Sequence, residues 1–114
     1  MSLTINTRER DGVTILDLSG KITLGEATGK LRDTVRALVG EGKKKLVFNL
    51  SGLDYMDSAG LGELVGAYTT VANSGGSLGL LKVKGRALDL LQMTRLATLF
   101  QLFDDEDTAV GSLA

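Results

Sequence analysis

The sequence predicts an α/β fold with a mixed, mostly parallel β-sheet, and two observations lead to this prediction. Segments rich in strand-forming residues alternate with segments whose apolar residues recur at helical spacing. Residues 46–50 (LVFNL) form a nearly continuous apolar run, which is typical of a parallel strand covered on both faces. The chain has no proline, no internal repeat and no low-complexity linker, so we expect residues 1–114 to form a single domain.

The first half of the chain predicts a hairpin, a helix and a central strand. Residues 3–9 and 13–18 are rich in strand formers and flank Asp11-Gly12, a pair typical of a tight turn. Residues 24–42 predict an amphipathic helix that ends at two glycines. Its apolar positions are Ala27, Leu31, Val35, Leu38 and Val39. The apolar strand 46–50 follows, and we expect it to lie at the centre of the sheet.

The second half predicts further helices and strands in alternation. After a turn over residues 53–62, a helix carries apolar residues at helical spacing and stops at residues 73–76 (NSGG). Those apolar residues are Leu61, Leu64, Val65, Tyr68 and Ala72. Residues 78–83 predict a strand, and residues 87–99 predict one helix or two short ones with a break near Thr94-Arg95. Leu102 and Phe103 predict a last short strand, and the acidic run 104–107 begins a terminal helix, where negative charge favours the helix dipole.

The composition excludes several classes of function. The absence of cysteine removes disulfides and thiolate chemistry, and the absence of histidine removes the commonest metal ligand and the usual general base. The net charge is −1 and no basic stripe extends beyond residues 43–45, so nucleic-acid binding has no electrostatic support. The sequence has neither the apolar segment of a signal peptide nor a run long enough to span a membrane. We therefore expect a soluble cytoplasmic protein without membrane insertion.

The stretch 53–62 (LDYMDSAGLG) is the candidate site. It places Asp57 and Ser58 side by side at the expected start of a helix. Serine and aspartate both cap helices by accepting a hydrogen bond from an early backbone N–H. Two good caps in a row exceed what one helix start needs, so one of the two side chains is available for another role. The sequence leaves open whether Ser58 caps the helix or stays free.

The glycines after the predicted strand 46–50 suggest a dinucleotide-binding motif, but their spacing differs from the spacing that this motif requires. GLGELVG reads G-x-G-x-x-x-G instead of G-x-G-x-x-G, no acidic ribose partner follows near residues 70–80, and a phosphate loop of the G-x-x-x-x-G-K-[ST] type is missing. We expect instead that Gly60, Gly62 and Gly66 let the helix approach a neighbouring element closely.

Catalytic roles for Asp57 and Ser58 lack the residues that they would need. A phosphoacceptor aspartate of the receiver type needs further carboxylates after its first strand to hold Mg²⁺, and residues 19–23 (SGKIT) contain none. A nucleophilic serine would need a G-x-S-x-G turn and a base, but the chain has no histidine and no S-x-x-K follows Ser58. We therefore expect no enzymatic activity.

A serine hydroxyl at a helix N-terminus suits regulation by phosphorylation. A phosphate on Ser58 would add a charge of about −1.5 to −2 beside the positive end of the helix dipole, so the fold should tolerate it. A partner pressed against that helix would meet an unpaired or like charge beside Asp57, which switches binding off.

The strand LVFNL, the following SGLDYM and the loop DSAGLG resemble the corresponding region of STAS domains, specifically those of the bacterial anti-sigma factor antagonists. The resemblance covers nearly the whole chain, including a hairpin that ends at Gly20, a Gly75-Gly76 turn and the terminal segment LFQLFDDEDTAV. It implies a STAS fold in which four to five helices pack mainly on one face of the sheet.

The resemblance also implies a function and a set of partners. Ser58 would be phosphorylated by a cognate anti-sigma factor that is also a serine kinase with an ATPase fold of the histidine-kinase type. The unphosphorylated protein would bind this kinase and release a sigma factor, and a metal-dependent serine phosphatase would reset it. ATP would belong to the kinase, so the chain itself would need no cofactor and no metal. We expect a monomer or weak homodimer.

The resemblance implies partner-binding residues in two segments: Thr23, Asp57, Ser58, Ala59, Gly60, Leu61 and Gly62. Ala59 stands where many members have a second serine or threonine, so Ser58 is the sole hydroxyl of the loop. Thr23 stands where several relatives carry an acidic residue that shapes the partner surface. Two alternatives stay open: a STAS scaffold or adaptor subunit in a stressosome-like or lipid-transport assembly, and a small nucleotide-binding module.

Overall fold

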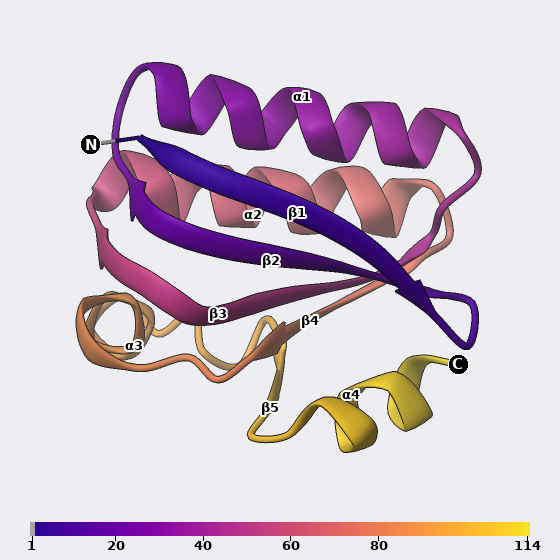
Figure 1. Cartoon of the computed structure of the whole chain (residues 1–114). Coiled ribbons are helices and arrows are strands. Elements are labelled where there is room, and N and C mark those ends of the chain that lie inside the picture. The colour runs from indigo at the N-terminus through magenta and orange to yellow at the C-terminus, as the bar shows by residue number, and fades with distance from the viewer. Residues whose placement is uncertain (1) are drawn as a thin grey trace.

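The computed structural model describes residues 2–114, which form a five-stranded sheet and four helices (Figure 1). The elements are β1 (Leu3–Arg10), β2 (Val13–Ile22), α1 (Glu26–Gly40), β3 (Lys45–Met56), α2 (Ser58–Asn73), β4 (Ser77–Leu81), α3 (Gly85–Met93), β5 (Gln101–Phe103) and α4 (Glu106–Leu113). This order of strands and helices confirms the order that the sequence predicts.

The sheet has the strand order β1-β2-β3-β4-β5. β1 and β2 are antiparallel and are joined at Asp11 (φ 52°) and Gly12 (φ 80°), the two positive φ values that a tight hairpin turn requires. The later neighbours β2-β3, β3-β4 and β4-β5 are all parallel, as right-handed crossovers through helices demand. β3 lies at the centre, which confirms the prediction for the apolar run.

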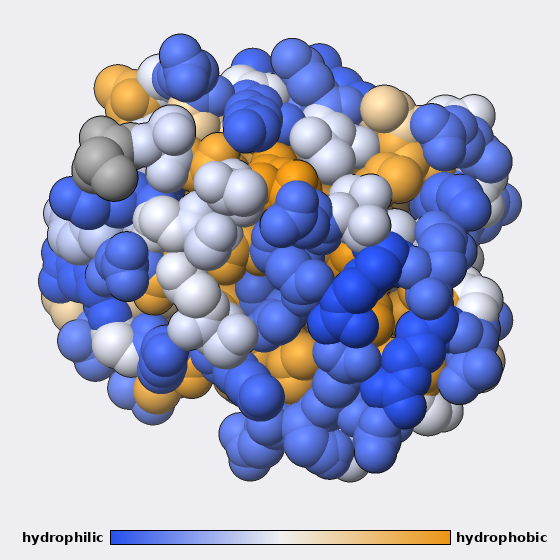
Figure 2. Space-filling view, viewed as in Figure 1, coloured by the Kyte–Doolittle hydropathy of each residue, from blue (hydrophilic) through white to orange (hydrophobic). Residues whose placement is uncertain are grey.

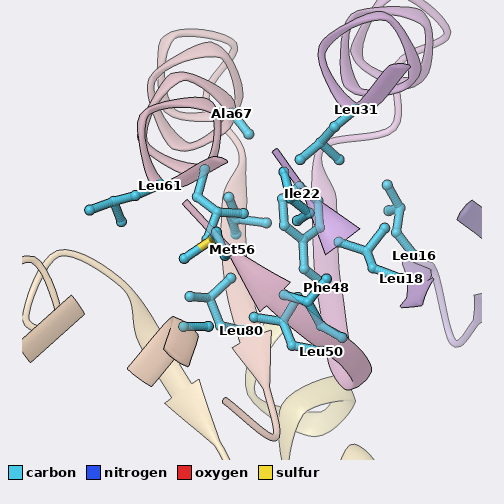
Figure 3. Packing of buried hydrophobic residues seen from close by; sticks show 14 of the residues in the cluster. Leu16, Leu18, Ile22, Leu31, Phe48, Leu50, Met56, Leu61, Ala67 and Leu80 are labelled. Atoms are coloured by element: carbon cyan, nitrogen blue, oxygen red, sulfur yellow. The ribbon is translucent and has the colours of Figure 1, made fainter. Parts of the chain in front are cut away.

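The larger part of the core lies between the sheet and three helices. In Figure 3, α1 and α2 are seen nearly end-on above the sheet, and the side chains of the strands fill the space beneath them. This cluster includes Leu16, Phe48 and Leu80 from the strands, and Leu31 and Ala67 from α1 and α2. α3 adds Ala87, Leu90 and Leu91 to the same cluster. Because only α4 packs on the other face, the predicted arrangement of helices mainly on one face is confirmed.

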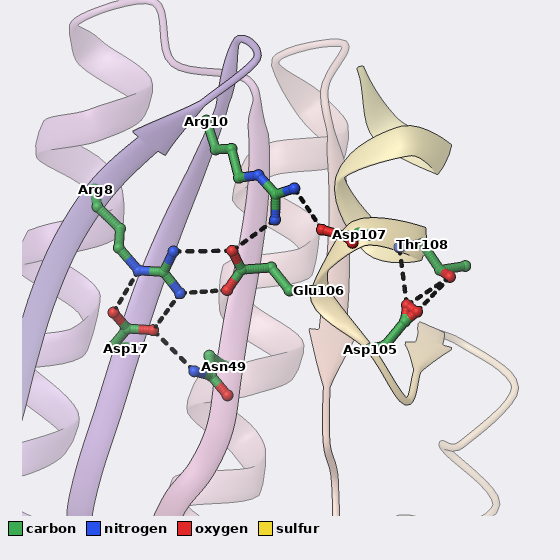
Figure 4. Close-up of polar contacts among 8 residues, drawn as sticks. All are labelled: Arg8, Arg10, Asp17, Asn49, Asp105, Glu106, Asp107 and Thr108. Atoms are coloured by element: carbon green, nitrogen blue, oxygen red, sulfur yellow. Dashed lines mark hydrogen bonds and ion pairs between the residues drawn. The ribbon is translucent and has the colours of Figure 1, made fainter.

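α4 covers part of the opposite face of the sheet. Its Ala109, Val110 and Leu113 pack on Val13, Ile15, Val47 and Leu81, and all seven are buried. Charged side chains hold the start of this helix against the hairpin (Figure 4). Glu106 accepts hydrogen bonds from the guanidinium groups of Arg8 and Arg10, and Arg8 also donates to Asp17, with 2.7 Å between Nε and Oδ2. The helix is therefore fixed by an apolar contact and by an ion-pair network.

The central strand is longer than the sequence predicts, and the expected turn over residues 53–62 is wrong for its first four residues. β3 continues to Met56, and Leu53 and Met56 point into the core. The pairing of β3 with β2 shifts register twice, because β3 carries an extra residue between the pairs Asp17–Asn49 and Ser19–Gly52 and another near Tyr55. Such bulges interrupt the period-two pattern by which a strand is recognised in a sequence.

One further boundary differs from the prediction because of backbone conformation. β4 ends at Leu81, two residues early, since Lys82 adopts a left-handed φ of 57°. The predicted break near Thr94-Arg95 is confirmed, because the helix in segment 87–99 ends at Met93, turns follow it, and Arg95 has a left-handed φ of 60°. Lys82 is not a glycine, so the sequence carries no clear signal for the end of β4.

Candidate functional site

The candidate site lies where β3 leaves the core and α2 begins. Met56, the last residue of β3, is fully buried, whereas Ser58, the first residue of α2, is exposed. This junction is at the carboxyl end of a central parallel strand, the edge at which ligands and partners usually meet such sheets. The junction of β2 and α1 lies at the same end of the molecule (Figure 1).

Asp57 holds both junctions together. Its Oδ1 accepts a hydrogen bond from the N–H of Gly60 at 2.8 Å and caps α2, and its Oδ2 accepts one from the N–H of Leu24 at 3.1 Å. The N–H of Asp57 donates to the carbonyl of Ile22 at 3.3 Å. The bonds from Gly60 and then Leu24 hold the pKa of the Asp57 carboxyl below its ordinary value, because they stabilise the charged form.

Ser58 does not cap the helix that it begins. The capping position belongs to Asp57, whose backbone is extended, and among residues 2–114 no side-chain hydrogen bond involves the Ser58 hydroxyl. The question that the sequence leaves open is thereby answered: the carboxylate of Asp57 is used by the fold, and the hydroxyl of Ser58 is free at the surface.

The three glycines of α2 have different roles. Gly60 is buried, and a Cβ there would lie 2.3 Å from the carbonyl oxygen of Ile22 and 2.6 Å from Cγ of Met56, so only glycine fits. Gly62 and Gly66 are exposed, and a Cβ at either would meet nothing within 4 Å. The expectation of a close approach is therefore confirmed for Gly60 and is wrong for Gly62 and Gly66.

The remaining residues of the predicted site lie around this junction with different exposures. Thr23 and Ala59 are half-buried, whereas Leu61 is only 6% exposed and belongs to the core. The structure thus brings Thr23, Asp57, Ser58 and Gly62 to one edge, but the Leu61 side chain does not reach the surface.

Sequence reasoning missed one residue of this edge. Leu24 has 79% of its surface exposed, although it was placed inside a predicted amphipathic helix. Figure 2 shows a small apolar patch among hydrophilic side chains over the start of α1. The sequence carries no signal for this exposure, because Leu24 precedes Ala27 by three residues and Leu31 by seven, which is the spacing of one helix face. The helix begins only at Glu26, so Leu24 lies in the loop before it.

The edge does not have the form of a small-molecule site. The adjoining hollow has a volume of about 250 Å³ and is lined by Leu53, Asp54, Tyr55, Lys84, Gly85, Arg86 and Ala87. That is below the roughly 300–1,000 Å³ of most ligand pockets. Residues 2–114 hold no group of three or more acidic side chains that could bind a metal ion. Nor is any helix within this range long and apolar enough to cross a membrane.

Comparison with known proteins agrees with this fold. The family model for the STAS domain matches residues 4–109. The anti-sigma F factor antagonist of Paenibacillus polymyxa is 30% identical over 99% of this chain and 97% of its own length.

Solved structures share the fold over almost the whole chain. An anti-sigma factor antagonist from Mycobacterium paratuberculosis superposes with a TM-score of 0.82 at 24% identity, and the match covers 97% of this chain and 93% of that one. The Bacillus cell fate determinant SpoIIAA in its phosphorylated form superposes with a TM-score of 0.77 at 18% identity, covering 97% of this chain and 100% of that one. The chain belongs to the STAS domain family.

Proposed function

We propose that this protein is an anti-sigma factor antagonist whose binding to its partner is switched off by phosphorylation of Ser58. Its similarity to the Paenibacillus polymyxa anti-sigma F factor antagonist supports the class of function. The observation that carries the site is the free, exposed hydroxyl of Ser58 at the first position of α2, where Asp57 already serves as the cap.

The geometry explains how a phosphate would act without unfolding the protein. The carboxylate of Asp57 already accepts the N–H groups of Gly60 and Leu24, so a phosphate on Ser58 would not replace it. The phosphate would stand at the surface beside the positive end of the α2 dipole, where the fold tolerates negative charge. A docked partner would have to desolvate that charge next to Asp57, which can cost several kcal/mol of binding free energy.

The proposed partners follow from this switch. The unphosphorylated protein binds an anti-sigma factor that is also a serine kinase of the histidine-kinase ATPase fold, and the sigma factor is released. A metal-dependent serine phosphatase removes the phosphate and restores binding. The exchange takes place in the bacterial cytoplasm, and the chain acts as a monomer or weak dimer that carries no cofactor and catalyses no reaction.

Phosphate transfer tests the proposal directly. Kinases of the histidine-kinase ATPase fold from the source organism are purified and incubated with the protein and radiolabelled ATP. At least one should label the wild type and a Ser112→Ala control, whose altered serine is also exposed but lies on α4, and none should label Ser58→Ala. Labelling of Ser58→Ala would contradict the site.

Binding to the same kinase tests the switch. Ser58→Ala should bind as tightly as the wild type, and Ser58→Asp should bind more weakly, with both variants unfolding at the wild-type temperature. Size-exclusion chromatography should give a monomer or weak dimer. A stable large assembly would contradict the proposal and favour the scaffold alternative.

A further inference from the structure

Leu24 is the most exposed of the large apolar side chains that stand out on the described part of the chain. Its exposure is 79%, compared with 73% for Met93, 42% for Leu102 and 40% for Tyr55. Single exposed apolar residues are normal on protein surfaces, so this exposure by itself has no functional meaning. What distinguishes Leu24 is how its backbone is held and what lies beside it.

The backbone on both sides of Leu24 is fixed by hydrogen bonds. Its own N–H donates to Oδ2 of Asp57 at 3.1 Å, and the preceding Ile22 carbonyl accepts the N–H of Asp57. On the other side, the N–H of Gly25 donates to Oγ1 of Thr28 at 3.2 Å, and Gly25 has a φ of 118° that only glycine adopts readily. The loop thus presents an apolar side chain to solvent from an ordered backbone, which reduces the entropy lost on binding.

The hydrogen bond from the Leu24 N–H to Oδ2 of Asp57, here called the tether, links Leu24 to the proposed phosphorylation site. Asp57 precedes Ser58 directly, so the residue that binds the Leu24 N–H is the covalent neighbour of the proposed phosphoacceptor. A kinase must enclose the Ser58 hydroxyl to transfer a phosphate to it. It would therefore cover the adjoining β2–α1 loop as well, and a neutral apolar side chain there calls for an apolar recess on the kinase.

We infer that Leu24 is an apolar anchor that inserts into a recess on the kinase acting at Ser58, and that Asp57 is the positioning residue that holds it there. The inference rests on the proposed function and adds to it a contact residue outside the phosphorylation loop. Residues that fill a well-packed, fully desolvated pocket carry most of the binding free energy of an interface. Asp57 acts through Leu24, since its Oδ2 accepts the Leu24 N–H while its Oδ1 caps α2.

The first test compares two exposed apolar residues. Affinity for the purified kinase that labels Ser58 is measured by isothermal titration calorimetry in the presence of ADP. Leu24→Ala should weaken binding by about thirtyfold or more, the usual threshold for an interface hot spot. Met93→Ala, a control of nearly equal exposure at the end of α3, should change affinity less than about twofold. Wild-type affinity of Leu24→Ala would overturn the inference while leaving the proposed function intact.

The second test distinguishes the two hydrogen bonds of Asp57, the one from Gly60 that caps α2 and the one from Leu24 that forms the tether. In Asp57→Asn, the remaining amide oxygen can still cap α2, since asparagine is as good a cap as aspartate, but the amide nitrogen would face the Leu24 N–H. This variant should unfold near the wild-type temperature yet lose about as much affinity as Leu24→Ala. The double variant should lose no more than either single one. If the fold-losses of affinity of the two single variants multiply in the double variant, Asp57 contacts the kinase independently of Leu24, and its proposed positioning role is wrong.

The same measurements distinguish failure of the inference from failure of the proposed function. If no kinase binds or labels the wild type, the proposed function fails and the anchor with it. If the wild type is bound and labelled at Ser58 while Leu24→Ala and Asp57→Asn behave like the wild type, only the anchor is refuted.

Discussion

At the scale of single residues, neighbouring residues at the junction of β3 and α2 have different roles. The Asp57 carboxylate accepts hydrogen bonds from two backbone N–H groups, and the absence of a side chain at Gly60 leaves room for the Ile22 carbonyl. The hydroxyl of Ser58, between them in sequence, takes part in neither contact. Because Asp57 and Gly60 make the contacts that fix the start of α2, we expect a phosphate on Ser58 to leave the helix start intact.

The glycines of α2 provide a matched pair of substitutions. Gly60→Ala should destabilise the protein by about 1–3 kcal/mol, because its Cβ would collide with the Ile22 carbonyl and force the backbone to move. Gly62→Ala should stabilise it by about 0.4–1 kcal/mol, because the site is open, the backbone is helical and alanine restricts the unfolded chain. Urea unfolding measures both free energies. Equal effects of the two substitutions would contradict the packing described for Gly60.

At the scale of elements, α4 is a short helix that depends on its surroundings. Eight residues are too few for a stable isolated helix, so its order comes from contacts with the sheet and the hairpin. Asp105 caps it by accepting the N–H of Thr108 at 3.1 Å, and Glu106 links it to Arg8 and Arg10. α4 thereby joins the end of the chain to β1, its opposite end in sequence.

This network predicts a loss of stability in acid. Hydrogen bonding to Arg8, with a further contribution from Arg10, lowers the pKa of Glu106 from 4.5 to about 2. Because the folded-state pKa is the lower one, the stabilisation is complete above about pH 4.5 and is lost as the pH falls toward 2. The urea midpoint of the wild type should therefore fall between pH 5 and pH 3.

Two variants test whether Glu106 is responsible. Glu106→Gln should show a smaller fall in the urea midpoint over that range than the wild type. Asp107→Asn should retain most of the fall, because the Asp107 side chain is 83% exposed and pairs only with Arg10 among the described ion pairs. The same pH dependence in Glu106→Gln as in the wild type would show that other carboxylates account for the effect.

At the scale of the whole molecule, one central strand organises both faces of the sheet. β3 gives Phe48 to the cluster beneath α1 and α2, and Val47 to the cluster beneath α4. The candidate site lies at the end of this same strand, so the core that stabilises the fold also places Ser58. In the proposed function, partner exchange would then proceed by a change of surface charge at this edge.

Phe48 tests this view of the core. Phe48→Ala should reduce the free energy of unfolding by about 3–5 kcal/mol, because the side chain is fully buried and its removal leaves a cavity in the core. Phe103→Ala, a half-buried control on the edge strand β5, should cost clearly less. Urea unfolding followed by circular dichroism measures both. Similar losses for the two variants would show that β3 has no special weight in stability.

The sequence predicts the order of the elements and the central place of the run 46–50, because hydrophobic periodicity and turn residues are local signals. The sequence is a poorer guide to features that depend on how two distant chain segments pack against each other. The extra residues in β3 hide its second half, and nothing local distinguishes Gly60 from Gly62. The free hydroxyl of Ser58 follows from the capping of α2 by Asp57, whose carboxylate also accepts the N–H of Leu24, 33 residues away in sequence.

By itself, then, the sequence determined the α/β class, the family resemblance, and the choice of LDYMDSAGLG as the candidate site, since these depend on residue types at short spacing. Tertiary structure decided which neighbour caps α2, which glycine is indispensable, and that Leu24 stands exposed beside Ser58. The physical reason is that each of these depends on where the end of β2 lies against the end of β3. Only the packed sheet brings those two ends together.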